Sequence, residues 1–361
     1  MRTFIKLYAV ILAIALSLNV QAYPGESIVR DPATGNYAIT YRGDPNNTEL
    51  SRTTFVPATK IDPSIRSRFR LGERGIITYR YTVSNGATAK QAIIGVVLEQ
   101  IVNPILAEIP EPSVLKNATL AEFDAYTAAE AAALASPIGW DGHINRRIPN
   151  VNWLPKFANF ANGGIHAGGT VSGFGFNSLD LPGMGPSRMA GVGDILNFPD
   201  DGPLDDSVIV AELDRLRDND FIARNAAVPM IAVPSPFDAA VLLDRIRTQV
   251  DTWSGKQLLD PAYAVQLDRY MVAAANAYRG NQPKIGKEHI ESVRKLLEHE
   301  HRFLDHDDED NDDTAEHKAA TRLAIDRLAA RVLDFDLRYV LKRIEKEHEH
   351  DHDEGDRRKE R

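Results

Sequence analysis

The hydrophobic periodicity of this chain changes near Phe237, and that change limits the folds open to it. Before this point, apolar and polar residues alternate in NYAITY (36–41) and IITYRYTV (76–83), with turn signals such as DPATGN and SNG beside them. A period of two predicts strands with one buried face. Beyond it, apolar residues recur every three or four positions, which predicts amphipathic helices. The sequence therefore predicts a multidomain α+β protein, with an N-terminal antiparallel β-sandwich region followed by a C-terminal antiparallel helical bundle.

Composition and turn signals divide the chain into six segments. These are a signal peptide (1–22), a β-sandwich domain (23–110), a helical insertion (111–136), a second β-rich region with a short helix (137–235), a helical bundle (236–346) with an acidic, histidine-rich loop (298–313), and a charged, histidine-rich tail (347–361). In the insertion, Thr119 stands three residues before Glu122, which is the spacing of a capping box and predicts a helix to about Ala135. In GFGF (173–176), alternation places both phenylalanines on one face of a strand.

Apolar residues at helical spacing predict the buried sides of the bundle helices. The predicted stripes are Val241, Leu242, Ile246 and Val250; Val265, Leu267, Met271 and Ala275; and Ile290, Val293, Leu297 and Leu304. A last helix of about thirty residues, with Asp313 as its cap, is predicted from another stripe. That stripe consists of Leu328, Val332, Phe335, Tyr339 and Ile344.

The first 22 residues are typical of an export signal. Arg2 and Lys6 give a positive start, residues 7–18 are apolar, and Val20-Gln21-Ala22 has the small residues that a signal peptidase needs. The apolar stretch is shorter than the roughly 20 residues of a membrane-spanning helix. We therefore expect the mature chain to begin near Tyr23, to be periplasmic or extracellular, and to keep no membrane span.

Composition excludes several classes of function. The chain has no cysteine, which excludes disulfides, thiol catalysis and cysteine-ligated metals. Its formal charge is −9, and removing the two positive charges of Arg2 and Lys6 makes it −11. With no evident basic patch to displace counterions, a chain this acidic is not expected to bind nucleic acid or anionic lipid.

Four quoted stretches together resemble a group of exported bacterial proteins of unknown function. They are YRYTVSNGATAKQAI (79–93), GW (139–140), HAGGTVSGFGFNSLDLPG (166–183) and LLDPAYAVQLDRYMVAAANAYRGN (258–281). The last resembles the FIMAH module, a small helical bundle near the C-termini of secreted and surface proteins. Residues that fit its pattern are Leu259, Ala264, Leu267, Ala275, Ala277, Gly280 and Asn281. The resemblance implies an immunoglobulin-like β region and an interaction or surface role, and it supplies no catalytic residue.

Histidines and carboxylates crowd into residues 298–313 and 347–356. Imidazole and carboxylate are the ligands left to a cysteine-free chain and suit zinc, nickel and copper, while a frame starting at Asp305 has calcium-loop spacing without the usual glycine. The candidate metal ligands are His299, His301, Asp305, His306, Asp307, Glu309, Asp313, Glu316, His348, His350 and His352. The alternative is that both stretches are solvated and serve solubility, because so many like charges repel one another.

A second candidate site is a ligand face made by Trp140, Asp141, His143 and Trp153. Exposed tryptophans beside a carboxylate suit a sugar, whose apolar side stacks on the indole ring. The alternative, which the usual burial of tryptophan favours, is that both tryptophans belong to the core of the second β region.

The sequence contains neither a nucleophile elbow nor a phosphate-binding loop. We therefore expect an exported, non-enzymatic binding or structural surface module with an unidentified protein or glycan partner. One alternative is a periplasmic or secreted protein that binds a divalent cation (zinc, copper, nickel or calcium) as its cofactor. A remote alternative is an extracellular carbohydrate-active protein.

Overall fold

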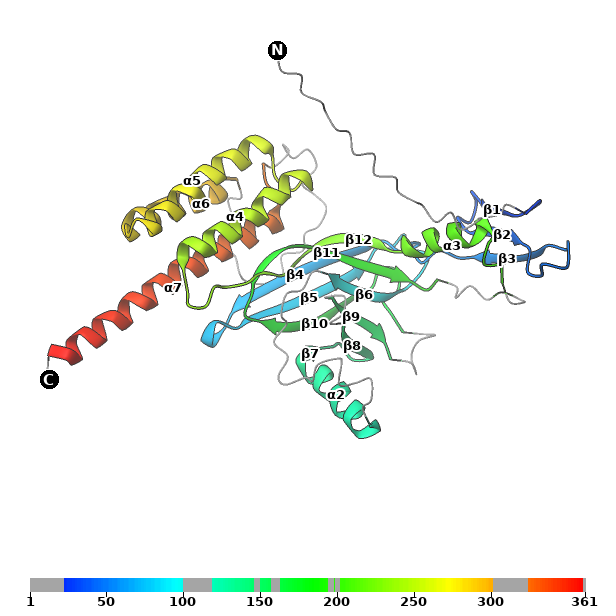
Figure 1. Cartoon of the computed structure of the whole chain (residues 1–361), viewed down its shortest axis with the longest axis horizontal. Coiled ribbons are helices and arrows are strands. Elements are labelled where there is room, and N and C mark those ends of the chain that lie inside the picture. The colour runs from blue at the N-terminus through cyan, green and yellow to red at the C-terminus, as the bar shows by residue number, and fades with distance from the viewer. Residues whose placement is uncertain are drawn as a thin grey trace, which may run out of the picture. The chain divides into compact units, whose positions relative to one another are not determined.

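The computed structural model describes residues 23–99, 119–145, 150–156, 163–193, 198, 202–300 and 324–359, with the last thirteen of these described by their backbone alone. The predicted signal peptide lies outside these ranges. Antiparallel sheets and helices are both present, which confirms the α+β class (Figure 1). None of the helices in these ranges is both long enough and apolar enough to cross a membrane.

The chain forms two compact units, each made of segments that are distant in sequence. The smaller unit contains residues up to Thr59 together with Val192–Phe221, and the larger contains Lys60–Gly191 together with Ile222–Arg361. The sequence-based domain ranges stay a prediction.

The smaller unit is a three-stranded sheet covered by one helix. Its strands are β1 (Ser27–Arg30), β2 (Tyr37–Tyr41) and β3 (Ser51–Phe55), paired in that order, and its helix is α3 (Val208–Asp218). Ser207 caps α3 by accepting a hydrogen bond from the backbone N–H of Ile209. The core of this unit consists of Ile39, Tyr41, Phe55, Ile209 and Leu213.

The larger unit contains two antiparallel sheets, ordered β4-β5-β10-β7 and β12-β11-β6-β9-β8. Their strands are β4 (Pro63–Leu71), β5 (Ile77–Asn85), β6 (Ile93–Glu99), β7 (Leu134–Ala135), β8 (Trp140–Asn145), β9 (Asn150–Pro155), β10 (Thr170–Ser178), β11 (Leu181–Gly191) and β12 (Ile222–Ile231). Aromatic rings connect the sheets, because Trp153 of β9 contacts Tyr81 of β5 and both Phe174 and Phe176 of β10. The two phenylalanines are both buried, as the alternation predicts.

The alanine-rich helix α2 (Leu120–Ala133) begins at the predicted capping box. The backbone N–H of Thr119 donates to Oε2 of Glu122 (2.7 Å), and the backbone N–H of Glu122 donates to Oγ1 of Thr119 (3.3 Å). The reciprocal bonds satisfy donors at the helix start that no intrahelical carbonyl can reach.

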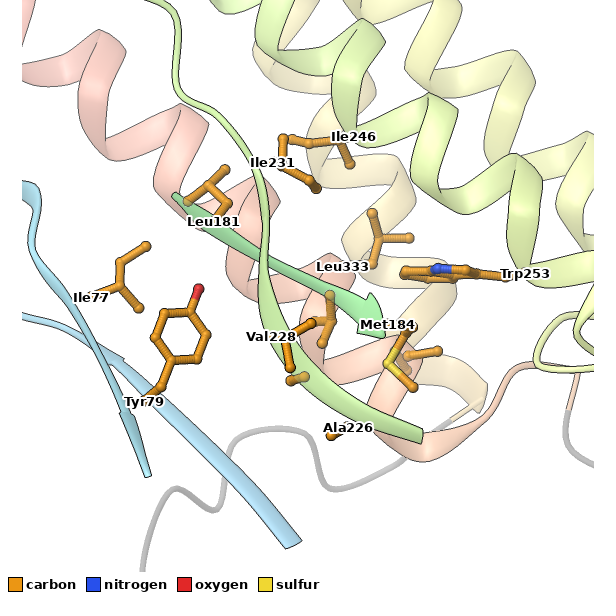
Figure 2. Packing of buried hydrophobic residues seen from close by; sticks show 14 of the residues in the cluster. Ile77, Tyr79, Leu181, Met184, Ala226, Val228, Ile231, Ile246, Trp253 and Leu333 are labelled. Carbon is orange, nitrogen blue, oxygen red and sulfur yellow. The ribbon is translucent and has the colours of Figure 1, made fainter. Parts of the chain in front are cut away.

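Four helices complete the larger unit: α4 (Ala239–Gly255), α5 (Pro261–Arg279), α6 (Pro283–Glu300) and α7 (Arg327–Lys359). Successive helices contact one another, α4 also contacts α7, and both of these pack against β11 and β12. Figure 2 shows part of the resulting core, to which the strands contribute Tyr79, Met184 and Val228 and the helices contribute Trp253 of α4 and Leu333 of α7. Sheets and helices therefore share one hydrophobic core.

Two members of the predicted helical stripes are exposed, and three members of the last stripe (Leu328, Phe335 and Ile344) are partly buried. Val241 is 37% exposed and Val265 is 71% exposed, whereas the other described members of the three bundle-helix stripes are buried. Leu242, Ile246 and Val250 lie on the buried side of α4. Each exposed valine lies just outside the buried side of its own helix. Leu304 and the expected cap Asp313 lie outside the described residues. As described, α7 begins after Asp326, whose carboxylate accepts the backbone N–H of Leu328 (2.8 Å).

Candidate functional site

The structure describes only a few of the candidate metal ligands. His299 is exposed near the end of α6. Seven candidates (His301, Asp305, His306, Asp307, Glu309, Asp313 and Glu316) lie outside the described residues, as do the side chains of His348, His350 and His352. Within the described part, no three histidine or carboxylate side chains are placed to share a metal ion. Metal binding by the two acidic stretches stays a prediction.

The tryptophans of the proposed ligand face are buried. Trp140 is 5% exposed and Trp153 is fully buried, with its indole Nε1 donating to the carbonyl oxygen of Ala135 (3.1 Å). Asp141 and His143 alternate with buried residues along β8 and are exposed, and Asp141 pairs with Lys156 at 3.6 Å. Both indole rings lie in the core, as the alternative interpretation requires, so neither offers a stacking surface to a sugar from solvent.

A different set of side chains gathers on the outer face of the four-stranded sheet. Along β4, Arg66, Arg68 and Arg70 are exposed. Ser67, which lies between the first two, is buried and points to the opposite side of the sheet. Because side chains alternate across a strand, the three arginines project from the same face. Residues two apart along a strand are separated by about 6.8 Å, so the guanidinium groups form a row.

The neighbouring strand adds a fourth arginine to this row. In the β4–β5 register, Arg80 lies directly opposite Arg68, with Thr82 opposite Arg66 and Thr78 opposite Arg70. Two like charges directly opposite each other destabilise a sheet. An antiparallel pair that needed only stability would not place two exposed arginines there.

Hydroxyl and amide groups form the rest of this face. Cross-strand hydrogen bonds of 2.8 to 2.9 Å join β5 to β10. The bonded pairs are Thr78 with Asn177, Thr82 with Ser172, and Ser84 with Thr170. We call the outward side of β4, β5 and β10 the arginine face. Its outward positions contain no aspartate, glutamate or aromatic residue.

Gly175 of β10 makes room for one of the arginines. It lies opposite Arg80 in the register, and a Cβ atom on Gly175 would lie 2.8 Å from Nη1 of Arg80 and 2.2 Å from the carbonyl oxygen of Tyr79. The same Nη1 donates to that carbonyl oxygen (2.9 Å). The guanidinium of Arg80 is therefore held across the strand where only glycine leaves space for it.

We expect Gly175→Ala to destabilise the larger unit by about 1–3 kcal/mol, because the carbonyl oxygen of Tyr79 belongs to a paired strand and cannot move aside. Urea denaturation followed by circular dichroism measures the change. Ser172→Ala on the same strand is the control and should cost less than about 1 kcal/mol, since it removes one exposed hydrogen bond. Equal stabilities for Gly175→Ala and the unmodified protein would contradict the close contact.

Among the described residues, no carboxylate compensates the positive charge of the arginine face. In the described part of the chain, Arg66, Arg68, Arg70 and Arg80 form no ion pair, although other arginines of the larger unit do, such as Arg188 with Glu99 (2.8 Å). The expectation that this acidic chain has no basic patch is therefore wrong. Its arginines are separated by other residues along the sequence, and only strand alternation and pairing bring them together. The sequence pattern that could have predicted this row is SIRSRFRL (64–71), where arginine recurs at every second position.

Comparison of the chain with protein-family models, with curated proteins and with solved structures found no match. The resemblance to FIMAH modules and immunoglobulin-like domains stays a prediction. The functional argument therefore rests on the geometry and charge of the arginine face.

Proposed function

We propose that this protein is an exported, non-enzymatic binding module that holds an acidic polysaccharide on the arginine face. The observation that carries the proposal is the row of exposed arginines, which have no carboxylate partner among the described residues, in a chain whose formal charge is −9. Such a chain repels polyanions at long range. A cationic face whose described outward positions hold no acidic residue favours, in this setting, a specific anionic ligand.

The residue type and the spacing favour an extended ligand. Arginine presents a planar fork of donors that matches a carboxylate, sulfate or phosphate group with two parallel hydrogen bonds. A row along β4 with a step of about 6.8 Å suits a chain whose anionic groups repeat. Arg80, held over Gly175, widens the row at its middle.

The other side chains of the face favour a glycan over a single-stranded nucleic acid. Proteins that bind single strands without sequence preference stack the bases on aromatic side chains, and the outward positions of the arginine face have none. Each hydrogen-bonded pair of hydroxyls, such as Thr82 with Ser172, keeps a donor for a ligand hydroxyl. The predicted export of the chain agrees with a cell-surface or extracellular glycan as partner.

In this proposal the two sheets of the larger unit form a β-sandwich, and α4 to α7 form a bundle packed at its β11 and β12 side. Ring contacts between Trp153 and Phe176 support the face-to-face packing of the sheets. A packed scaffold of this kind keeps the strands that carry the arginine row fixed, so that the ligand does not have to order them on binding.

The test measures binding of polygalacturonate, a polymer of uronic acid, to the mature protein at several salt concentrations. We expect the triple variant Arg66→Gln/Arg68→Gln/Arg70→Gln to bind at least about tenfold more weakly, with a shallower dependence of affinity on salt, because fewer counterions are displaced. Arg269→Gln, which removes one exposed arginine from α5, is the charge control and should bind normally. The triple Arg→Lys variant keeps the charge and should lose the affinity contributed by paired hydrogen bonds.

The possible results test separately whether the arginine face is a binding site and whether its ligand is a glycan. Failure of every tested polyanion to bind, or binding that the triple glutamine variant leaves unchanged, would overturn the arginine face as a site. Single-stranded DNA that binds as tightly as polygalacturonate, with the same dependence on the arginines, would overturn the choice of a glycan and keep the site. Binding only to vesicles that contain anionic lipid would assign the face to a membrane surface instead.

A further inference from the structure

The described chain begins with a tight turn formed by Tyr23, Pro24, Gly25 and Glu26. The backbone N–H of Glu26 donates to the carbonyl oxygen of Tyr23 (3.2 Å), and Gly25 has a φ of +88°. Proline at the second position and a glycine with positive φ at the third are the signature of a type II turn. The turn brings the Glu26 side chain back beside the backbone nitrogen of Tyr23.

The Glu26 carboxylate joins three parts of the smaller unit. Its Oε2 lies 3.4 Å from the backbone nitrogen of Tyr23 and accepts a hydrogen bond from Oγ of Ser207 (2.7 Å). Its Oε1 accepts the backbone N–H of Arg42 (3.0 Å). Since Ser207 is the cap of α3 and Arg42 follows β2, one carboxylate connects the start of the described chain to a strand and a helix.

The Tyr23 side chain is fixed independently of its backbone. Its hydroxyl donates to the Asp206 carboxylate, 3.1 Å from each oxygen, and the guanidinium of Arg42 lies over its ring at 5.2 Å. Tyr23 is thereby fixed to residues beside β2 and α3. These contacts hold the nitrogen of Tyr23 within the smaller unit, and Tyr23 is the residue at which the signal-peptide pattern predicts that the mature chain begins.

We infer that removal of the export signal between Ala22 and Tyr23 completes this cluster, because the new α-ammonium of Tyr23 pairs with the carboxylate of Glu26. Hydrolysis of the peptide bond consumes one water and leaves a carboxylate on Ala22 and an ammonium on Tyr23. Before cleavage, the nitrogen is a neutral amide with one N–H. After cleavage it carries a positive charge and three donors, so the 3.4 Å contact becomes a charge-assisted hydrogen bond.

The charged groups around Tyr23 favour the ammonium form. Glu26 faces the nitrogen, and Asp206, also acidic, lies at the far end of the side chain. Among the contacts of Tyr23 with the described residues, Arg42 is the one opposing cation. A paired ammonium has its pKa raised above the ordinary range of about 7.7–8.0. The pairing therefore stabilises the mature fold fully below that range and is lost as the pH rises through the raised pKa.

The experiment compares two preparations of the mature protein, one starting at Tyr23 and one with a single glycine before it. NMR titration of the ¹³C-methylated amino terminus gives the pKa of each α-amino group. We expect a raised pKa when the chain starts at Tyr23 and an ordinary pKa for the glycine-extended chain. Glu26→Gln in the Tyr23-initiated chain should restore the ordinary pKa, and Glu49→Gln, at an exposed position of the same unit, should leave it raised.

Three results would overturn the inference. The first is an ordinary α-amino pKa in the Tyr23-initiated protein, and the second is a raised pKa that Glu26→Gln does not change. The third is a mature terminus at a different residue, found by mass spectrometry of the exported protein. Should Glu26→Gln fail to fold, the glycine-extended chain still provides the comparison with Glu26 intact. The inference does not depend on what the arginine face binds.

Discussion

Trp153→Ala is expected to lower the free energy of unfolding of the larger unit by about 3–5 kcal/mol. Trp153 is fully buried, with ring centroids 5.6 Å from Phe174 and 6.4 Å from both Tyr81 and Phe176. Truncation removes these contacts from between the two sheets and leaves a cavity that rigid strands fill only in part. It also leaves the carbonyl oxygen of Ala135 without its indole donor.

Urea denaturation followed by circular dichroism measures this loss, with Leu154→Ala as the matched control. Leu154 is the next residue of β9, points to the opposite face and is 40% exposed. Its truncation should cost less than about 1 kcal/mol, because little area returns to water. Comparable losses for the two variants would show that Trp153 does not belong to the core between the sheets.

Asp336→Asn is expected to stabilise the protein at neutral and alkaline pH. Asp336 of α7 is 1% exposed, and its Oδ1 has no hydrogen-bond partner in the described structure. Burial raises the pKa of this carboxyl well above its usual value, so the native state keeps a proton that the unfolded chain releases. Each pH unit between the unfolded and the folded pKa then costs about 1 kcal/mol of stability. The asparagine variant removes this cost because it does not ionise.

The sign of this effect follows from where the proton is held. A carboxyl with a raised folded pKa destabilises the fold as the pH rises above the ordinary carboxyl pKa near 4, and the loss grows until the folded pKa is reached. Burial also raises the pKa of Asp180, to about 6. About one pH unit above 6 the contribution of Asp180 is nearly complete, so the remaining slope from these two carboxyls belongs to Asp336. Stability curves from about pH 7 to 9 for Asp336→Asn and the unmodified protein isolate it.

Asp334→Asn provides a control with the opposite expected sign. Asp334 lies two residues earlier in α7 and accepts hydrogen bonds from Nε of Arg294 (2.9 Å) and Nε of Arg338 (2.7 Å). Losing a nearly buried carboxylate that binds two guanidinium groups should cost about 1–3 kcal/mol. If both substitutions destabilise the protein to a similar extent, the carboxyl of Asp336 has a partner in solution that keeps it ionised.

Local patterns predicted local structure well. The capping box at Thr119 and Glu122, the alternation that buries Phe174 and Phe176, and the presence of helices after Phe237 all depend on residues close together in the sequence. Hydrogen bonds within a helix turn and side-chain alternation in a strand require no distant partner. The exposed valines Val241 and Val265 show the limit, since the width of a buried stripe depends on what packs against it.

The sequence by itself determined the α+β class, the positions of the turns and helix caps, and the location of the acidic stretches. The tertiary structure decided which residues face each other. Arg80 meets Arg68 only because β4 and β5 pair in one register, and a shift of one residue would turn the arginines toward the core. Glu26 reaches Ser207 across 181 positions of the chain. Periodicity describes one segment at a time, whereas charge clusters and buried carboxyls depend on packing between segments that the sequence keeps far apart.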